Sequence, residues 1–183
     1  DCYIRYRLEE NNSLLIVTAI HNRSKESIPV ADGWHPYFGF GGSIENLQLQ
    51  VKSSAMLEYD QALIPTGKTV NFNPWFNCSK IGDTKQDHGY ILDFTQPQPL
   101  CSLTDPDSGI TIELHPERSY PYLQLYTPDH RKSIAIENLS AAPDAAFHEH
   151  PSDVPGTQCA WQQPPEGKMF VVSGRRRGCP RRP

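Results

Sequence analysis

Short segments of apolar or alternating residues, separated by turn-forming residues, recur along most of this chain and constrain its fold more than any other feature. Residues 14–20 (Leu-Leu-Ile-Val-Thr-Ala-Ile) and 110–114 (Ile-Thr-Ile-Glu-Leu) are two examples. Such segments are typical of β-strands, and no long segment has the period of about 3.6 residues that marks an amphipathic helix. The sequence therefore predicts an all-β protein. We expect strands at residues 14–20, 28–30, 47–51, 90–94, 110–114, 122–126 and 133–139.

The stretches between these segments favour an antiparallel arrangement. Residues 11–13 (Asn-Asn-Ser) and 65–67 (Pro-Thr-Gly) combine residue types that tolerate tight turns. The 17 prolines would interrupt helices because they lack a backbone N–H group, whereas loops and strand ends tolerate them. We predict a sandwich of antiparallel sheets.

Composition excludes several classes of protein. With 21 acidic and 17 basic residues and a net charge of -4, the chain offers no basic face for nucleic acid before its last residues. No run of about 18 apolar residues is present to span a membrane. The five cysteines are scattered without a Cys-x-x-Cys pair, so they predict neither a zinc site nor a redox motif. Free thiols fit a reducing compartment, and we expect a cytoplasmic protein.

The composition changes from about residue 148. Residues 148–183 are rich in Pro, Gly, Arg and Gln, and only 169–172 (Met-Phe-Val-Val) has the pattern of a strand. We expect one partial β-sandwich domain at 1–147, followed by a Pro- and Arg-rich tail at 148–183 that is disordered or non-native. The basic end, 175–183, could contact phosphate or an anionic surface, but a disordered tail is the favoured interpretation.

Two segments carry residues suited to proton transfer. In residues 33–38 (Gly-Trp-His-Pro-Tyr-Phe), His35 is enclosed by aromatic residues and precedes a proline that restricts the local backbone. An imidazole can donate or accept a proton near neutral pH, although a histidine among aromatics is often structural. Glu137 interrupts the apolar strand at 134–139, where alternation puts it on the face opposite Ile136. It is either a base facing a ligand or a strand residue facing solvent.

Together these two segments resemble the aldose 1-epimerase, or galactose mutarotase-like, family. Its members carry a His-Pro-Tyr-Phe-like motif and a late strand with a glutamate before a Pro-Asp-Ala loop, here residues 143–145; the resemblance spans roughly 14–147. It implies a large antiparallel β-sandwich, the galactose mutarotase-like supersandwich. It also implies that His35 is the general acid and Glu137 the general base. Asp87, in Gln-Asp-His-Gly-Tyr, matches a substrate-binding aspartate, although a hairpin-loop aspartate is an equal alternative.

The resemblance implies an enzyme that interconverts the α and β anomers of an aldohexose such as galactose or glucose. Opening the sugar ring needs one group that removes a proton and another that supplies one, and no metal or other cofactor. Trp34, Tyr37 and Trp75 are candidates to cover the apolar face of the sugar. A hexose 6-phosphate is the alternative substrate. The early basic residues that could lie near its phosphate are Arg5, Arg7, Arg23 and Lys25, but their spacing forms no phosphate-binding pattern.

The chain is shorter than the family it resembles. The family has further strands, with an arginine or asparagine and another histidine, before the region that corresponds to residue 14. We therefore expect an incomplete sandwich, an N-terminally truncated fragment. A non-catalytic carbohydrate-binding β-sandwich and an inactive fragment are the alternatives. The expected partner is a free aldose sugar, and the sequence does not determine an oligomeric state.

Overall fold

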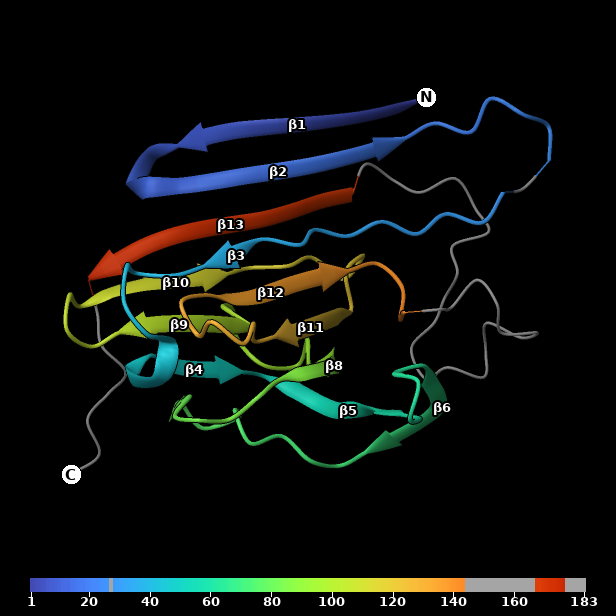
Figure 1. Cartoon of the computed structure of the whole chain (residues 1–183). Coiled ribbons are helices and arrows are strands. Elements are labelled where there is room, and N and C mark those ends of the chain that lie inside the picture. Colours follow the sequence, from blue (N-terminus) through green and yellow to red (C-terminus); the bar gives the residue numbers. More distant parts are fainter. Residues whose placement is uncertain (27, 144–166, 177–183) are drawn as a thin grey trace.

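A computed structural model describes residues 1–26, 28–143 and 167–176, which form two antiparallel sheets (Figure 1). The first sheet has seven strands in the order β1 (Cys2–Glu9), β2 (Ser13–Ile20), β13 (Gly167–Arg176), β10 (Ile110–Leu114), β9 (Cys101–Asp105), β4 (Gln48–Val51) and β7 (Ser79–Lys80). The second has six, in the order β3 (Tyr37–Phe38), β12 (Ile134–Leu139), β11 (Tyr122–Tyr126), β8 (Asp87–Leu92), β5 (Ser53–Tyr59) and β6 (Pro65–Val70). Two 3₁₀ turns, η1 (Glu10–Asn12) and η2 (Ile44–Asn46), are the only helical segments among these residues. The prediction of an all-β protein is confirmed.

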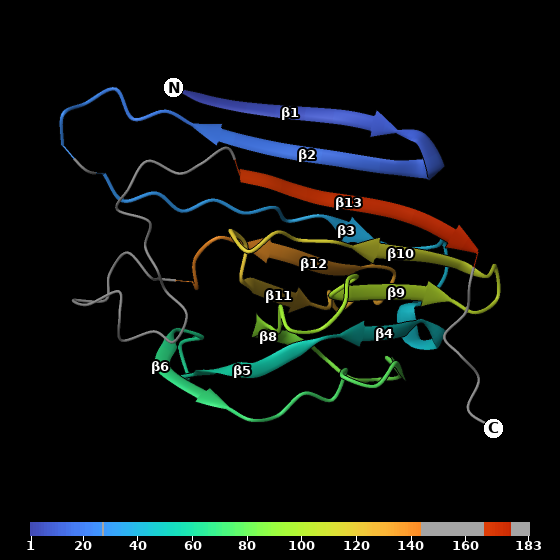
Figure 2. The ribbon, with the colours of Figure 1, turned by 180° about the vertical axis from the view of Figure 1, so that it is seen from behind.

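The main core lies between the two sheets. Leu103 and Leu114 of the first sheet pack in one cluster with Leu125 and Ile136 of the second, and all four are fully buried. Burying one such side chain contributes about 1.5–3 kcal/mol. The view from behind shows β12, β11 and β8 side by side in the middle of the second sheet (Figure 2). The opposite face of these three strands points away from the core and carries the polar residues described below.

Most of the predicted strands are present. Predicted strands at 14–20, 47–51, 110–114, 122–126 and 133–139 correspond to β2, β4, β10, β11 and β12, and 169–172 lies within β13. The predicted strand at 90–94 begins earlier and ends at Leu92 of β8. The strand predicted at 28–30 is wrong, since these residues form no ladder and Pro29 has no N–H group to donate to one. The predicted boundary at 147 and the rest of the predicted tail lie outside the described residues.

One expectation about the cysteines is corrected. Cys2 and Cys101 carry free thiols, and burial raises the pKa of the Cys101 thiol. Cys78, however, is disulfide-bonded, so the expectation of free thiols throughout does not hold. Within the described ranges, no helix is long and apolar enough to cross a membrane.

Candidate acid/base site on the second sheet

The segment that contains His35 runs along the free edge of β12. Gly33 forms a bridge with Leu139, and Tyr37 of β3 pairs with Ala135. Counting inward from both pairs puts His35 directly opposite Glu137. His35 and Glu137 thus occupy a non-hydrogen-bonded position of the antiparallel pairing, where the Cα atoms of the two strands are closest, at about 4.5 Å.

His35 and Glu137 are in direct contact. His35 Nε2 lies 3.0 Å from Glu137 Oε1. The imidazole also stacks on the ring of Tyr37, with centroids 4.9 Å apart and planes inclined by 26°. The side chain of His35 is 53% exposed and that of Glu137 only 10%. A buried carboxylate thus meets an imidazole that remains open to solvent and to a ligand.

The environment of Glu137 favours its protonated form. Burial raises the pKa of Glu137, the imidazole of His35 opposes this rise, and the carboxylate of Asp87 adds to it. A base with a raised pKa accepts a proton more readily than an exposed glutamate. Glu137 is therefore both shielded from water and more basic than usual.

Asp87 and Gln124 continue the same face onto the neighbouring strands. Gln124 of β11 pairs with Glu137 on one side and with Gly89 of β8 on the other. Its Nε2 atom donates a hydrogen bond of 2.8 Å to Asp87 Oδ1, and its Oε1 atom accepts one of 3.0 Å from the hydroxyl of Tyr59. The structure thus brings Asp87 into the electrostatic environment of Glu137. Sequence reasoning missed Gln124 and Tyr59, although a glutamine in the apolar strand Tyr-Leu-Gln-Leu-Tyr interrupts the pattern as Glu137 does in β12.

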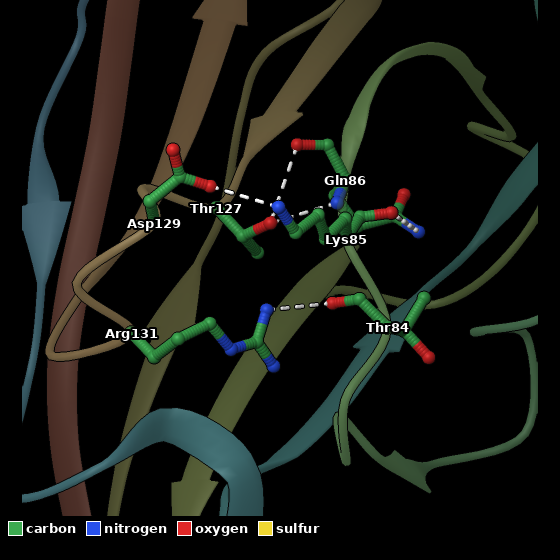
Figure 3. A network of polar contacts seen from close by, with 6 residues as sticks. All are labelled: Thr84, Lys85, Gln86, Thr127, Asp129 and Arg131. Carbon is green, nitrogen blue, oxygen red and sulfur yellow. Dashed lines mark hydrogen bonds and ion pairs between the residues drawn. The ribbon is translucent and has the colours of Figure 1, made fainter.

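The start of β8 is held by a network of loop contacts (Figure 3). The buried residues Gln86 and Thr127 exchange hydrogen bonds: Gln86 N donates to Thr127 Oγ1 at 2.8 Å, and Thr127 N donates to the Gln86 carbonyl at 2.9 Å. Arg131 Nη1 donates to the carbonyl of Thr84 at 2.9 Å. The exposed Lys85–Asp129 pair adds a contact of 2.9 Å, which at a surface contributes little to stability. Gln86 directly precedes Asp87, so this network fixes the backbone from which Asp87 projects.

One of the predicted aromatic contacts lies in the core and another packs against it. Trp75 is 3% exposed and packs in the main core cluster, so its side chain does not face the site and the prediction is corrected. Its loop sequence, Asn-Pro-Trp-Phe-Asn, suggested exposure, but Asn73 binds the backbone of Val51 at 2.8 Å and draws the loop inward. Trp34 also packs against this cluster, on the side of its segment opposite His35 and Tyr37. Of the three aromatics, only Tyr37 lies beside the acid/base pair.

These residues form a polar cluster on an antiparallel β-sandwich whose chemistry is suited to proton transfer. Two groups that can each give or take a proton lie within one hydrogen bond of each other, and a second carboxylate is nearby. Among the described residues, no group of three or more His, Cys, Asp or Glu side chains is placed to hold a metal ion.

Comparison with known proteins identifies the family. The family model described as aldose 1-epimerase matches residues 1–163, which covers most of the chain. The chain therefore belongs to the aldose 1-epimerase family. The match begins before residue 14 and ends beyond residue 147, the limits of the resemblance found in the sequence. No match was found among curated proteins.

Solved structures share the fold. A GalM/aldose epimerase homologue from C. elegans superposes with a TM-score of 0.72 at 14% identity, over 96% of this chain and 59% of that one. A galactose mutarotase-like protein from Clostridium acetobutylicum gives 0.70 at 16% identity, over 94% and 54%. A putative aldose 1-epimerase from Escherichia coli K12 gives 0.66 at 16% identity, over 94% and 55%. The fold is that of the galactose mutarotase-like proteins, and the chain spans somewhat more than half the length of these relatives.

Proposed function

We propose that this protein is a mutarotase that interconverts the α and β anomers of an aldohexose such as galactose or glucose. The observation that carries the proposal is the 3.0 Å contact between His35 Nε2 and Glu137 Oε1 in a member of the aldose 1-epimerase family. The anomeric hydroxyl and the ring oxygen of an aldohexose are bonded to the same carbon. The two protein groups that act on them must therefore lie close together, as His35 and Glu137 do.

In the proposed reaction, Glu137 removes the proton from the anomeric hydroxyl while His35 protonates the ring oxygen. The bond between C1 and the ring oxygen breaks, and the electrons left on the anomeric oxygen form the aldehyde. Rotation about the C1–C2 bond presents the other face of the aldehyde. His35 and Glu137 then act in reversed roles as the ring closes. Both groups return to their starting protonation states, so the cycle consumes no cofactor.

Asp87 and Tyr37 are the proposed sugar contacts. Asp87 is partly exposed on the site face and can accept hydrogen bonds from sugar hydroxyls. The ring of Tyr37 is 52% exposed and, stacked on His35, offers a flat apolar surface beside the acid/base pair. A phosphorylated sugar is less well supported, since two of the early basic residues, Arg7 and Arg23, are ion-paired with Glu9 and Asp1.

Replacing Glu137 tests the proposal. We expect Glu137→Gln to lose turnover by a factor on the order of 10² to 10⁴ while it still binds sugar, because the amide keeps the shape but cannot accept the proton. Polarimetry of α-glucose and α-galactose measures turnover, and calorimetric titration measures binding.

A matched control is available in the other sheet. Glu113 and His115 form a second His–Glu contact, of 3.4 Å, away from this face. Glu113→Gln makes the same chemical change there and should leave mutarotation unaltered. Full turnover in folded Glu137→Gln would remove Glu137 from the proposed role. Sugar binding without mutarotation in the unaltered chain would instead support a non-catalytic carbohydrate-binding protein. This alternative is kept because the chain spans only about half the length of its relatives.

A further inference from the structure

A hydrogen-bonded chain leads from Asp87 of the site into the second sheet. Asp87 accepts from Gln124, which in turn accepts from the hydroxyl of Tyr59. Tyr59 comes from β5, the strand on the far side of β8 from Gln124. To reach Gln124, its side chain must cross over β8.

The crossing point is Gly89. A Cβ atom built on this residue would lie 2.5 Å from the Tyr59 hydroxyl, 2.8 Å from Leu57 Cδ1 and 3.1 Å from Gln124 Oε1. Its backbone has no positive φ angle, so conformational freedom does not explain the glycine. The missing side chain instead leaves the space in which Tyr59 and Gln124 meet.

The donor and acceptor roles of Tyr59, Gln124 and Asp87 fix the direction of these hydrogen bonds. An ionised carboxylate only accepts hydrogen bonds, so the nitrogen end of the Gln124 amide faces Asp87. The oxygen end then needs a donor on the Gly89 side, which the Tyr59 hydroxyl supplies. Burial, reinforced by Asp87, raises the pKa of Tyr59 to about 12, so the phenol keeps its proton at physiological pH.

We propose that Tyr59 is a positioning residue. Its hydroxyl fixes the orientation of the Gln124 amide, and this amide directs the Asp87 carboxylate toward the sugar. Tyr59 acts only through Gln124, and its contact with the substrate is not required. The prediction for kinetics rests on the proposed function, because Asp87 is a sugar contact only in that proposal. The prediction for the Gln124 amide does not depend on it.

Tyr59→Phe removes the hydroxyl and keeps the ring that packs against Leu57 and Tyr122. We expect KM for galactose to rise about 2- to 10-fold, the effect of one hydrogen bond, with kcat within about twofold of the unaltered protein. Gly89→Ala places a methyl group where the Tyr59 hydroxyl lies and so displaces this hydroxyl. This variant should also raise KM.

Tyr90→Phe is the matched control. The Tyr90 hydroxyl also donates to a glutamine, Gln86 Oε1, at 2.9 Å, but it does so inside the core, on the face of β8 opposite to the one that Tyr59 crosses. Its loss should lower the melting temperature and leave KM unchanged, because Tyr90 binds only the side chain of Gln86, whose backbone N and O remain held by Thr127. An equal rise of KM in Tyr90→Phe and Tyr59→Phe would show a general loss of packing and would overturn the proposal.

The orientation itself can be followed in the ligand-free protein by the side-chain amide signal of Gln124 in a ¹H–¹⁵N spectrum. Asp87→Asn should shift this signal when Tyr59 is present and shift it less in Tyr59→Phe. An equal shift in both backgrounds overturns the positioning role. Absence of mutarotation in the unaltered protein would contradict the proposed function instead, while this spectrum would still decide the role of Tyr59.

Discussion

At the scale of single residues, the burial of Glu137 has a consequence for pH dependence. Burial and the Asp87 carboxylate raise the pKa of Glu137 above the ordinary glutamate value of about 4.3, and His35 opposes the rise. Only the ionised base can accept the first proton, so kcat/KM falls as pH drops through this raised pKa. We expect the acid limb of the pH profile, measured by polarimetry between pH 4 and 8, to lie above the range of an exposed glutamate.

Asp87→Asn provides the control for this pH profile. Removing the Asp87 charge removes one cause of the raised pKa, so the acid limb should move to lower pH even if KM rises. Tyr59, which also interacts with Glu137, stays neutral over this range because its pKa is about 12. An acid limb that stays in place or moves upward in Asp87→Asn would contradict this account of Glu137.

The residues of the site differ in how far the sequence could predict them. Only the family resemblance pairs His35 with Glu137, because nothing in a spacing of about a hundred residues indicates that two strands are neighbours. The sequence does not place Trp75 in the core, because loop composition does not reveal that Asn73 draws the loop inward. The sequence does not indicate Tyr59, because its proposed role depends on the empty space above Gly89, which only the cross-strand register reveals.

At the scale of elements, the His35 segment comes very close to β12 and the residues before it at two glycines. A Cβ atom on Gly33 would collide with Leu139 and lie 3.0 Å from the carbonyl oxygen of Asn138. A Cβ atom on Gly39 would lie 2.5 Å from the carbonyl oxygen of Lys132. Glycine at both ends therefore lets the segment approach close enough for His35 to reach Glu137.

Gly39→Ala should separate these elements, since its new methyl group meets backbone that cannot rotate away. Displacing His35 by about 1 Å costs on the order of 10- to 100-fold in turnover, although no site residue is changed. Polarimetry beside a thermal melt measures the effect. Gly42→Ala is the control, because its Cβ would meet nothing within 4 Å. Equal turnover in the two variants would show that close approach at Gly39 does not set the position of His35.

Two of the strands that the sequence did not predict, β5 and β9, have identifiable physical reasons. β9 buries Ser102 and Thr104, which a hydrophobic pattern counts as exposed, and the Thr104 hydroxyl lies 2.9 Å from that of Thr111 on β10. In β5, an irregularity between Ser53 and Ala55 interrupts the alternation. Alternating or apolar segments predicted strands in both sheets, whereas buried hydroxyls concealed β9 and a bulge concealed β5.

At the scale of the whole molecule, the last described strand joins two parts of the first sheet. β13 pairs with β2 on one side and with β10 on the other (Figure 1). Without it, the β1–β2 hairpin loses its connection to the β10–β9–β4–β7 part of the sheet. Both newly unpaired edges would expose backbone groups that pair in the intact sheet.

A chain that ends at residue 166 should therefore be much less stable than the full chain. The lost ladder involves six pairs with β2 and five with β10, and each backbone hydrogen bond contributes about 1 kcal/mol. Even a net loss of about 3 kcal/mol lowers the melting temperature of a chain of this size by roughly 10 °C. A chain that ends at Arg176 keeps β13 and is the control. If 148–183 were a tail without a structural role, both shortened chains would melt with the full chain in calorimetry, and the stabilising role of β13 would be refuted.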